Sequence, residues 1–228
     1  MLYIVATPIG NLEDISLRQA KTIADSDILL SEDTRSAQKI IIAIKEKFGL
    51  ITKKNLHIQS FYKENEFQIT YKILKELGAG KDIVLISESG LPLISDPGGF
   101  LVKEVIKRNI QFTVIPGPTA LTTALVHSGF NSKNFMFIGF LPKKNTGIRK
   151  LINNFKDINK IRKDLTIIFY ESIHRINNTL KIFDELIPDS NICICREMTK
   201  KFEEIIRGKP KDLMNRKYKG EITVVLSC

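Results

Sequence analysis

The sequence is poor in the residues that would place it among disulfide-rich secreted or metal-binding proteins. Among its 228 residues there are only three cysteines and three histidines. Three cysteines cannot form the paired disulfide framework of a small secreted domain. We interpret Cys193 and Cys195, one residue apart in an apolar run, as buried thiols on one face of a strand. The histidines His57, His127 and His174 are scattered, so no metal site is expected.

Long uninterrupted hydrophobic runs are also missing. The longest stretch without Lys, Arg, Asp or Glu covers residues 109–132, but Pro116-Gly117-Pro118 breaks it in the middle. Residues 1–6 are apolar but too short for a signal peptide, and no basic region precedes them. We therefore expect a soluble protein with no membrane contact, and its cysteine usage fits a reducing cytoplasm.

Two common nucleotide-binding motifs are missing as well. Residues 78–82 read Gly-Ala-Gly-Lys-Asp, but they lack the earlier glycine and the following Ser or Thr of a phosphate-binding loop. No G-x-G-x-x-G motif follows an expected strand, which argues against a dinucleotide site.

What the sequence does contain is an ordinary globular composition, with 43% hydrophobic and 26% charged residues. Short β-rich runs alternate with longer helical patterns, which predicts an α/β fold with mostly parallel sheets. Strands are expected at residues 2–6, 27–31, 83–87, 112–115, 135–138, 166–170, 192–195 and 222–226, with 55–61 as a further candidate. Helices are expected at residues 17–24, 36–48, 66–77, 98–107, 119–127, 175–186 and, with a weaker pattern, 211–218.

A stiff turn divides the chain into two nearly equal halves. Residues 115–119 contain two prolines that restrict the backbone and a glycine that turns it. We therefore predict two α/β domains, residues 1–115 and residues 116–228, with the active cleft between them.

The charge is basic and unevenly distributed. Lys and Arg total 35 against 25 Asp and Glu, a formal net charge of +10. Residues 143–163 carry eight basic residues and one acid, and residues 200–219 carry eight basic residues and three acids. One such run is typical of a solvated helix face, but two runs in one domain favour binding to a phosphate backbone.

Five loops with reactive or flexible residues follow expected strands. They are residues 6–12, 31–35, 87–99, 116–120 and 169–175. Open α/β sheets bind their ligands at the carboxyl ends of the strands. Each loop alone is compatible with an ordinary turn, but five loops at one sheet edge favour a ligand site.

Motifs in these loops and in further segments of the chain, taken together, resemble those of one family. They are TPIGNLEDIS, EDTR, SESGLPLISDPG, PGPTA, GFLPKK, FYESIHR, REMTKKFEE and KGEITVVL. In this order and over essentially the whole chain, they resemble the bacterial 16S rRNA cytidine 2′-O-methyltransferases, within the tetrapyrrole methylase superfamily. The resemblance implies a class III methyltransferase fold, S-adenosylmethionine in the cleft between the domains, a homodimer, and methylation of a ribose in the ribosomal P site of the small subunit.

The resemblance also assigns residues to the cofactor. Main-chain groups of the loops are expected to line its site, and the residues are Pro8, Gly10, Ser87, Glu88, Ser89, Gly90, Leu93, Ile94, Thr119, Ala120, Phe169, Tyr170, Ile222 and Thr223.

A ribose 2′-hydroxyl is a weak nucleophile, so a general base or a polarising lysine is expected beside the cofactor. The loops offer Asp33, Glu171 and Lys200 for this role, with Glu32 and Glu197 as further candidates. An alternative interpretation of residues 32–35 is a helix start with Thr34 as N-cap. RNA contacts are expected from a set of basic side chains: Arg35, Lys143, Lys144, Arg149, Lys150 and Arg175.

The sequence departs from the family pattern in two places. The usual Ser-Asp-Ala-Gly-Thr-Pro reads Ser-Glu-Ser-Gly-Leu-Pro over residues 87–92, and two histidines are replaced within residues 60–66. Two other functions therefore remain open. A tetrapyrrole methylase would share the fold and the cofactor, although the basic runs and the EDTR motif argue against it. A non-catalytic RNA-binding module is the third hypothesis, motivated by Glu88 and Ser89.

Overall fold

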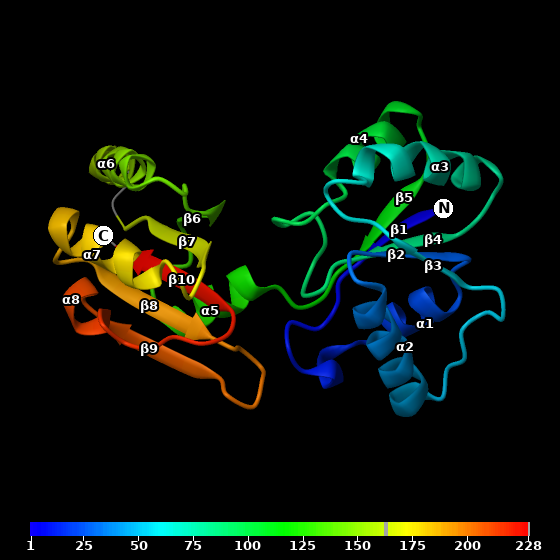
Figure 1. Ribbon diagram of the computed structural model, residues 1–228, viewed down its shortest axis with the longest axis horizontal. Helices are drawn as coiled ribbons and strands as arrows, with labels where there is room; N and C mark the ends of the chain where they lie inside the picture. Colours follow the sequence, from blue (N-terminus) through cyan, green and yellow to red (C-terminus); the bar gives the residue numbers. More distant parts are fainter. Residues whose placement is uncertain (162–163, 228) are drawn as a thin grey trace. The chain divides into compact units, whose positions relative to one another are not determined.

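The protein is described by a computed structural model that covers residues 1–161 and 164–227. It divides into two compact units, Met1–Thr119 and Ala120–Cys228 (Figure 1). Residues 116–119 thus belong to the first unit, whereas the sequence pattern assigns them to the second domain. Arg162 and Lys163, the last two cations of the first basic run, lie outside the described residues, as does Cys228.

The first unit is built on a parallel sheet with the strand order β3-β2-β4-β1-β5. The strands are β1 (Leu2–Val5), β2 (Ile28–Ser31), β3 (His57–Ser60), β4 (Ile83–Ile86) and β5 (Phe112–Ile115). All four strand pairs are parallel. Central strands of such a sheet must be apolar on both faces, and every residue of β2 and β4 is buried.

Helices cover both faces of this sheet, because alternate residues of each strand point to opposite sides. Helices α1 (Leu17–Ala24) and α2 (Thr34–Phe48) pack on the face that carries Leu29 and Val84. Helices α3 (Glu66–Gly78) and α4 (Gly99–Lys107) pack on the opposite face, with Leu30 and Leu85 (Figure 1). A short 3-10 helix, η1 (Leu12–Asp14), precedes α1.

The second unit contains a mixed sheet with the order β6-β7-β10-β8-β9. The strands are β6 (Phe135–Phe140), β7 (Thr166–Glu171), β8 (Asn191–Arg196), β9 (Glu204–Gly208) and β10 (Ile222–Ser227). Only β6 and β7 pair in parallel; the other three pairs are antiparallel. The prediction of mostly parallel sheets is therefore wrong for this unit. No helix separates β8 from β9, so β9 returns beside β8 in the opposite direction.

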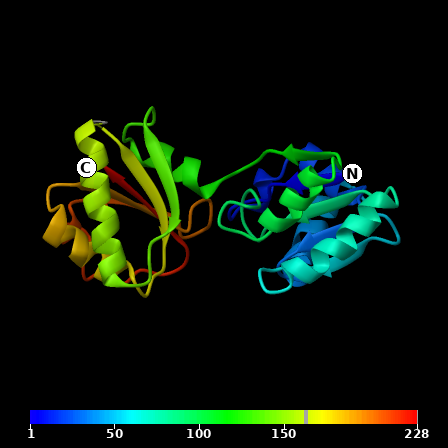
Figure 2. The same cartoon turned by 90° about the horizontal axis from the view of Figure 1, so that it is seen from above.

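The helices of the second unit are α5 (Ala120–Ser128), α6 (Asn145–Ile161), α7 (Ile176–Leu186) and α8 (Pro210–Leu213). Helices α6 and α7 pack against the sheet face that carries Ile167 and Phe169 (Figure 2). Cys193 and Cys195 are buried free thiols, as expected, and the Cys195 Sγ lies 3.9 Å from the carbonyl oxygen of Ala124 in α5. Helix α6 and strand β9 are not predicted by the sequence pattern. In residues 1–161 and 164–227, no helix is long and apolar enough to cross a membrane.

Candidate functional site

Four of the five predicted loops lie at one edge of the first sheet. They follow β1, β2, β4 and β5, and the carboxyl ends of parallel strands meet at one edge. The fifth loop follows β7 and belongs to the other sheet. The expectation of five loops at a single sheet edge is therefore corrected, because the chain builds two separate sheets.

The loops after β1 and β4 are joined by main-chain hydrogen bonds. The Thr7 N–H donates to the Gly90 carbonyl at 2.8 Å, and the Gly90 N–H donates back at 3.2 Å. The buried Thr7 hydroxyl also donates to the Ser87 carbonyl, at 3.2 Å. Gly90 has φ +84°, and a Cβ there would lie 3.3 Å from Ile9 Cγ2 and 3.5 Å from the Pro118 carbonyl oxygen. Only glycine fits this position without strain, and it brings Pro8, residues 87–90 and Thr119 into one neighbourhood.

The segment after Gly90 has an unusual backbone. Leu93 and Ser95 have φ of +71° and +77°, and Gly98 has φ +120°, where a Cβ would lie 2.7 Å from Leu85 Cδ2. Left-handed backbone at a residue with a side chain costs about 1–2 kcal/mol. Such strain gathers at ligand-binding loops, and here it falls on Leu93, an expected cofactor contact, and on Ser95, which follows the expected contact Ile94.

The loop after β5 is held by a buried glutamine that the sequence motifs did not single out. Gln19 in α1 is fully buried and its side chain donates to the Pro116 carbonyl at 3.2 Å. A side chain at Gly117 would collide with Gln19 and with the Ala6 Cβ. The signal in the sequence is Ser16, three residues earlier, which forms a capping box with Gln19 and fixes the start of α1.

The residues of the EDTR motif start helix α2. Asp33 is the N-cap and accepts a hydrogen bond from the Arg35 N–H at 2.8 Å, which confirms a helix start but places the cap at Asp33 instead of Thr34. The Arg35 guanidinium also binds the Asp33 carboxylate, with Nη2–Oδ2 at 2.8 Å. These hydrogen bonds hold the pKa of Asp33 below its usual range. Asp33 is thus a stable carboxylate with little tendency to take up a proton.

One acid at this edge behaves differently and was not among the predicted site residues. Burial, together with the smaller effect of the charges of Glu32 and Glu88, raises the pKa of Asp96 to about 7. The pKa of Glu32 is also raised, by burial and by the charges of Glu88 and Glu64. Negative charge is therefore crowded around the loop after β4, and Asp96 is the member that titrates near neutrality.

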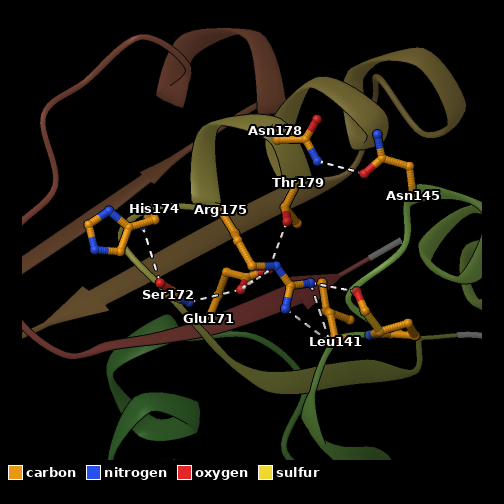
Figure 3. Close-up of polar contacts among 9 residues, drawn as sticks. Leu141, Asn145, Glu171, Ser172, His174, Arg175, Asn178 and Thr179 are labelled. Atoms are coloured by element: carbon orange, nitrogen blue, oxygen red, sulfur yellow. Dashed lines mark hydrogen bonds and ion pairs between the residues drawn. The ribbon is translucent and has the colours of Figure 1, made fainter.

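In the second unit, the end of β7 is tied to two other segments by a buried carboxylate. Glu171 is 3% exposed and accepts from the Ser172 N–H at 2.8 Å and from the Thr179 hydroxyl at 2.7 Å (Figure 3). The Arg175 Nε lies 3.6 Å from Glu171, and its guanidinium donates to the carbonyls of Leu141 and Pro142. Glu171 and Arg175 therefore fasten the loop after β6 to the start of α7.

Some of the basic side chains predicted to bind RNA are bound to other groups of the protein, and others are exposed. Arg175 is engaged with main-chain carbonyls, and Arg149 pairs with Glu185. Lys143, Lys144 and Lys150 are exposed. Two of these free cations thus directly follow the loop segment that Arg175 holds.

Lys200 lies between two carboxylates. Its Nζ is 3.0 Å from Glu197 Oε1 and 2.9 Å from Glu221 Oε2. Burial alone lowers the pKa of Lys200, but the hydrogen bonds to Glu221 and Glu197 outweigh it and raise the pKa above its usual range. The ammonium is therefore a fixed positive charge, not a proton acceptor.

The remaining expected cofactor contacts lie along β7 and β10. Thr223 pairs with Tyr170 and Ile222 pairs with Glu171 in the antiparallel ladder. The Tyr170 ring lies 5.0 Å from the ring of Phe137. Phe169 points into the core against Phe183, so only its main chain is available for a ligand. Ala120 begins α5 in this unit, whereas Thr119 belongs to the first.

Comparison with known proteins identifies similar chains. The family model described as tetrapyrrole (corrin/porphyrin) methylases matches residues 1–214. Ribosomal RNA small subunit methyltransferase I of Thermotoga maritima is 41% identical over 231 residues, covering 99% of this chain and 97% of that protein. The protein of the same name from Halalkalibacterium halodurans is 39% identical over 207 residues, covering 91% of this chain and 67% of that protein. The crystal structure of the methyltransferase CobJ shares the fold, with a TM-score of 0.67 at 16% identity, covering 99% of this chain and 92% of that one.

Proposed function

The chain belongs to the tetrapyrrole methylase family and, within it, to the ribosomal RNA small subunit methyltransferases, and from this premise we propose its reaction and its substrate atom. The proposed reaction transfers a methyl group from S-adenosylmethionine to the ribose 2′-oxygen of a cytidine in the P-site region of 16S rRNA. The observation that carries the proposal is the 41% identity with a small subunit methyltransferase over nearly the full length of both chains.

The loops of the first unit fit the cofactor. The close approach at Gly90, where a Cβ would meet Ile9 and Pro118, leaves main-chain groups of neighbouring loops as the lining. Such a lining suits a ligand with an amino-acid end, a ribose and an adenine but no phosphate. Pro8, Gly10 and residues 87–90 would hold it, together with Leu93, Ile94 and Thr119. When bound, S-adenosylmethionine supplies a methyl group activated by a sulfonium, which is open to in-line attack by an oxygen.

We assign proton removal to Asp96. An efficient general base has a pKa near the working pH, and the Asp96 carboxyl titrates at about 7 in the loop after β4. The other three candidates are already engaged. Asp33 is ion-paired with Arg35, Lys200 keeps its proton between two carboxylates, and the Glu171 carboxylate accepts hydrogen bonds within the protein. In this proposal these three residues hold structure and charge, and an Asp96 oxygen accepts the proton of the ribose hydroxyl.

The exposed cations of the second unit are proposed to bind the RNA backbone. Lys143, Lys144 and Lys150 are exposed, and Arg35 adds a side chain that is 88% exposed in the first unit. Such contacts orient the substrate without reading its sequence. We further propose that the protein works in the cytoplasm and as a homodimer, which analytical ultracentrifugation would show as twice the 25.9 kDa chain mass.

The proposal is tested with small ribosomal subunits from cells that lack this protein. Purified protein and methyl-labelled S-adenosylmethionine should label 16S rRNA. The phosphodiester bond that follows the labelled cytidine should resist alkaline hydrolysis, because a 2′-O-methyl group removes the hydroxyl that attacks it. Calorimetry with S-adenosylhomocysteine tests cofactor binding separately from the choice of substrate. Binding of that ligand without labelling would overturn the substrate, whereas no binding would overturn the enzymatic function and favour a non-catalytic RNA-binding module.

A further inference from the structure

Three aromatic side chains form a cluster on α3 and α4, here named the aromatic platform: the exposed Phe67 and Tyr71 and the half-buried Phe100. The ring centroids of Phe67 and Tyr71 are 5.3 Å apart, and those of Phe67 and Phe100 are 5.1 Å apart. Phe67 is 61% exposed and Tyr71 is 43% exposed. Contiguous exposed apolar side chains of this kind are typical of binding sites.

The platform lies at the same edge of the first sheet as the candidate site. Phe67 and Phe100 are the second residues of α3 and α4, and these helices start where β3 and β4 have ended. The Glu66 carboxylate accepts from the Gly98 N–H at 3.1 Å and from the Phe100 N–H at 2.8 Å, so the two helix starts are held together (Figure 1). Gly98 ends the loop that carries Asp96, which places the rings beside the proposed reaction site.

Positive charge accompanies the rings. Lys63 precedes α3, Lys75 follows Tyr71 by one helical turn, and Lys103 follows Phe100 by one turn; all three are exposed. None of these lysines forms an ion pair with another described residue. Protein–protein interfaces are depleted of lysine, whereas single-stranded nucleic acids bind to lysines beside stacking aromatics. The charge therefore favours RNA over a second protein chain as the occupant.

We infer that the aromatic platform stacks an unpaired base of the substrate RNA next to the methylated nucleotide. The inference rests on the proposed function and adds a binding subsite to it. Proteins that recognise single-stranded RNA commonly stack splayed bases on Phe and Tyr rings. The platform would hold a neighbouring nucleotide while the lysines contact its phosphates.

The test compares Phe67→Ala and Tyr71→Ala with the natural protein in methyl transfer to small subunits. Loss of one stacked base should raise KM for the subunit by roughly tenfold, with kcat changed much less. Phe67→Trp keeps a stacking ring and should restore KM. Ile106→Ala is the matched control, because it shortens a 57% exposed apolar side chain of α4 and should leave KM unchanged. Thermal unfolding and binding of S-adenosylhomocysteine confirm that every variant is folded.

The outcomes separate this inference from the proposed function. Labelling by the natural protein with an unchanged KM in Phe67→Ala would overturn the platform and leave the reaction intact. No labelling by the natural protein would overturn the reaction itself. A Phe67→Ala variant that sediments as a smaller species than the natural protein would identify the rings as a contact between copies and would also overturn the inference.

Discussion

At the scale of single residues, Gly90 joins the backbone of two loops and leaves no room for a side chain. We expect Gly90→Ala to lower the free energy of unfolding by about 1–2 kcal/mol, because alanine is strained at positive φ. Its Cβ would also press on Ile9 Cγ2 at 3.3 Å and on the Pro118 carbonyl, so affinity for S-adenosylhomocysteine should fall at least tenfold. Denaturant titration and calorimetry measure the two effects.

Gly49→Ala is the matched control for this prediction. Gly49 has φ +66° but no atom within 4 Å of its added Cβ, so it shares the backbone strain without the crowding. It should lose similar stability and keep full affinity for the ligand. Equal affinity losses in both variants would show that crowding at Gly90 is irrelevant to the site.

Asp96 supplies a prediction about pH. Its pKa of about 7 in the folded protein lies above the ordinary value of 3.8, so the folded state holds a proton that the unfolded state has released. Relative to Asp96→Asn, the free energy of unfolding should therefore fall as pH rises from about 4 to 7 and level off above. Methyl transfer should show the opposite trend, rising through about pH 7 as Asp96 becomes a carboxylate, and Asp96→Asn should lose this rise.

Asp33→Asn is the contrasting variant, because the pKa of Asp33 is lowered by Arg35. Its ionised form stabilises the folded state above the ordinary pKa, and this stabilisation is lost as pH falls through the lowered value. A stability difference between natural protein and Asp96→Asn that stays constant with pH would contradict the raised pKa and the assignment of the base.

These two residues also show what sequence can and cannot indicate. The helix start at Asp33 follows from local chemistry, since a short acid before a helical pattern caps it. The raised pKa of Asp96 depends on burial, which the fold creates, and on the charges of Glu32, which follows β2, and of Glu88 in the same loop. No local pattern shows which acid of this loop becomes buried. The motif at residues 87–98 was therefore recognisable, but the raised pKa of its Asp96 was not.

At the scale of elements, the contact of Glu171 and Arg175 joins β7, α7 and the loop after β6. We expect Glu171→Ala to lower the free energy of unfolding by about 2–4 kcal/mol, because the buried Thr179 hydroxyl loses its acceptor and Arg175 loses its counter-charge. Chemical denaturation measures this loss.

Arg149→Ala serves as the comparison, because it breaks the partly exposed ion pair with Glu185 and should cost less than about 1 kcal/mol. If Glu171→Ala costs no more than Arg149→Ala, the carboxylate does not stabilise the loop.

Arg175→Ala should raise KM for the small subunit, because the segment that presents Lys143 and Lys144 would no longer be held.

The elements that were predicted, and those that were not, differ in their sequence signal. Helix α1 has the expected bounds, residues 17–24, because a capping box and a clear apolar stripe mark it. Helix α6 buries Ile148, Ile152 and Phe155 at helical spacing, so its apolar stripe is present in the sequence. It was missed because the interpretation of residues 143–163 rested on their basic charge. Strand β9 is a short edge strand with charged Glu204 and Arg207, so its pairing with β8 depends on a partner and not on its own composition.

At the scale of the whole molecule, the topology of the first unit was predictable and that of the second was not. Strands alternating with helices predict a parallel sheet, and β1 to β5 form one. The same alternation continues through β6 and β7, but β10 inserts between β7 and β8. Strand pairing over such distances is decided by packing, so the residue pattern alone leaves the direction of β10 open. The same holds for the candidate site. Its loops were predictable from their motifs, but only the fold shows that four of them belong to the first sheet and one to the second.

The net charge of +10 leads to a final prediction on the binding of the whole protein to RNA. Each phosphate neutralised by a lysine releases counterions, so log K for RNA should fall linearly with log salt. Removing Lys143 and Lys144 together should make that slope shallower by about 1.5–2 units, while binding of S-adenosylhomocysteine stays unchanged. Lys54→Ala, an exposed lysine at the opposite edge of the first sheet, should leave the slope as it is. Filter binding to a 16S rRNA fragment at several salt concentrations measures all three. A slope that Lys54→Ala changes as much as the double variant would show that the charge acts through the overall field, and the loop after β6 would then have no special role in holding RNA.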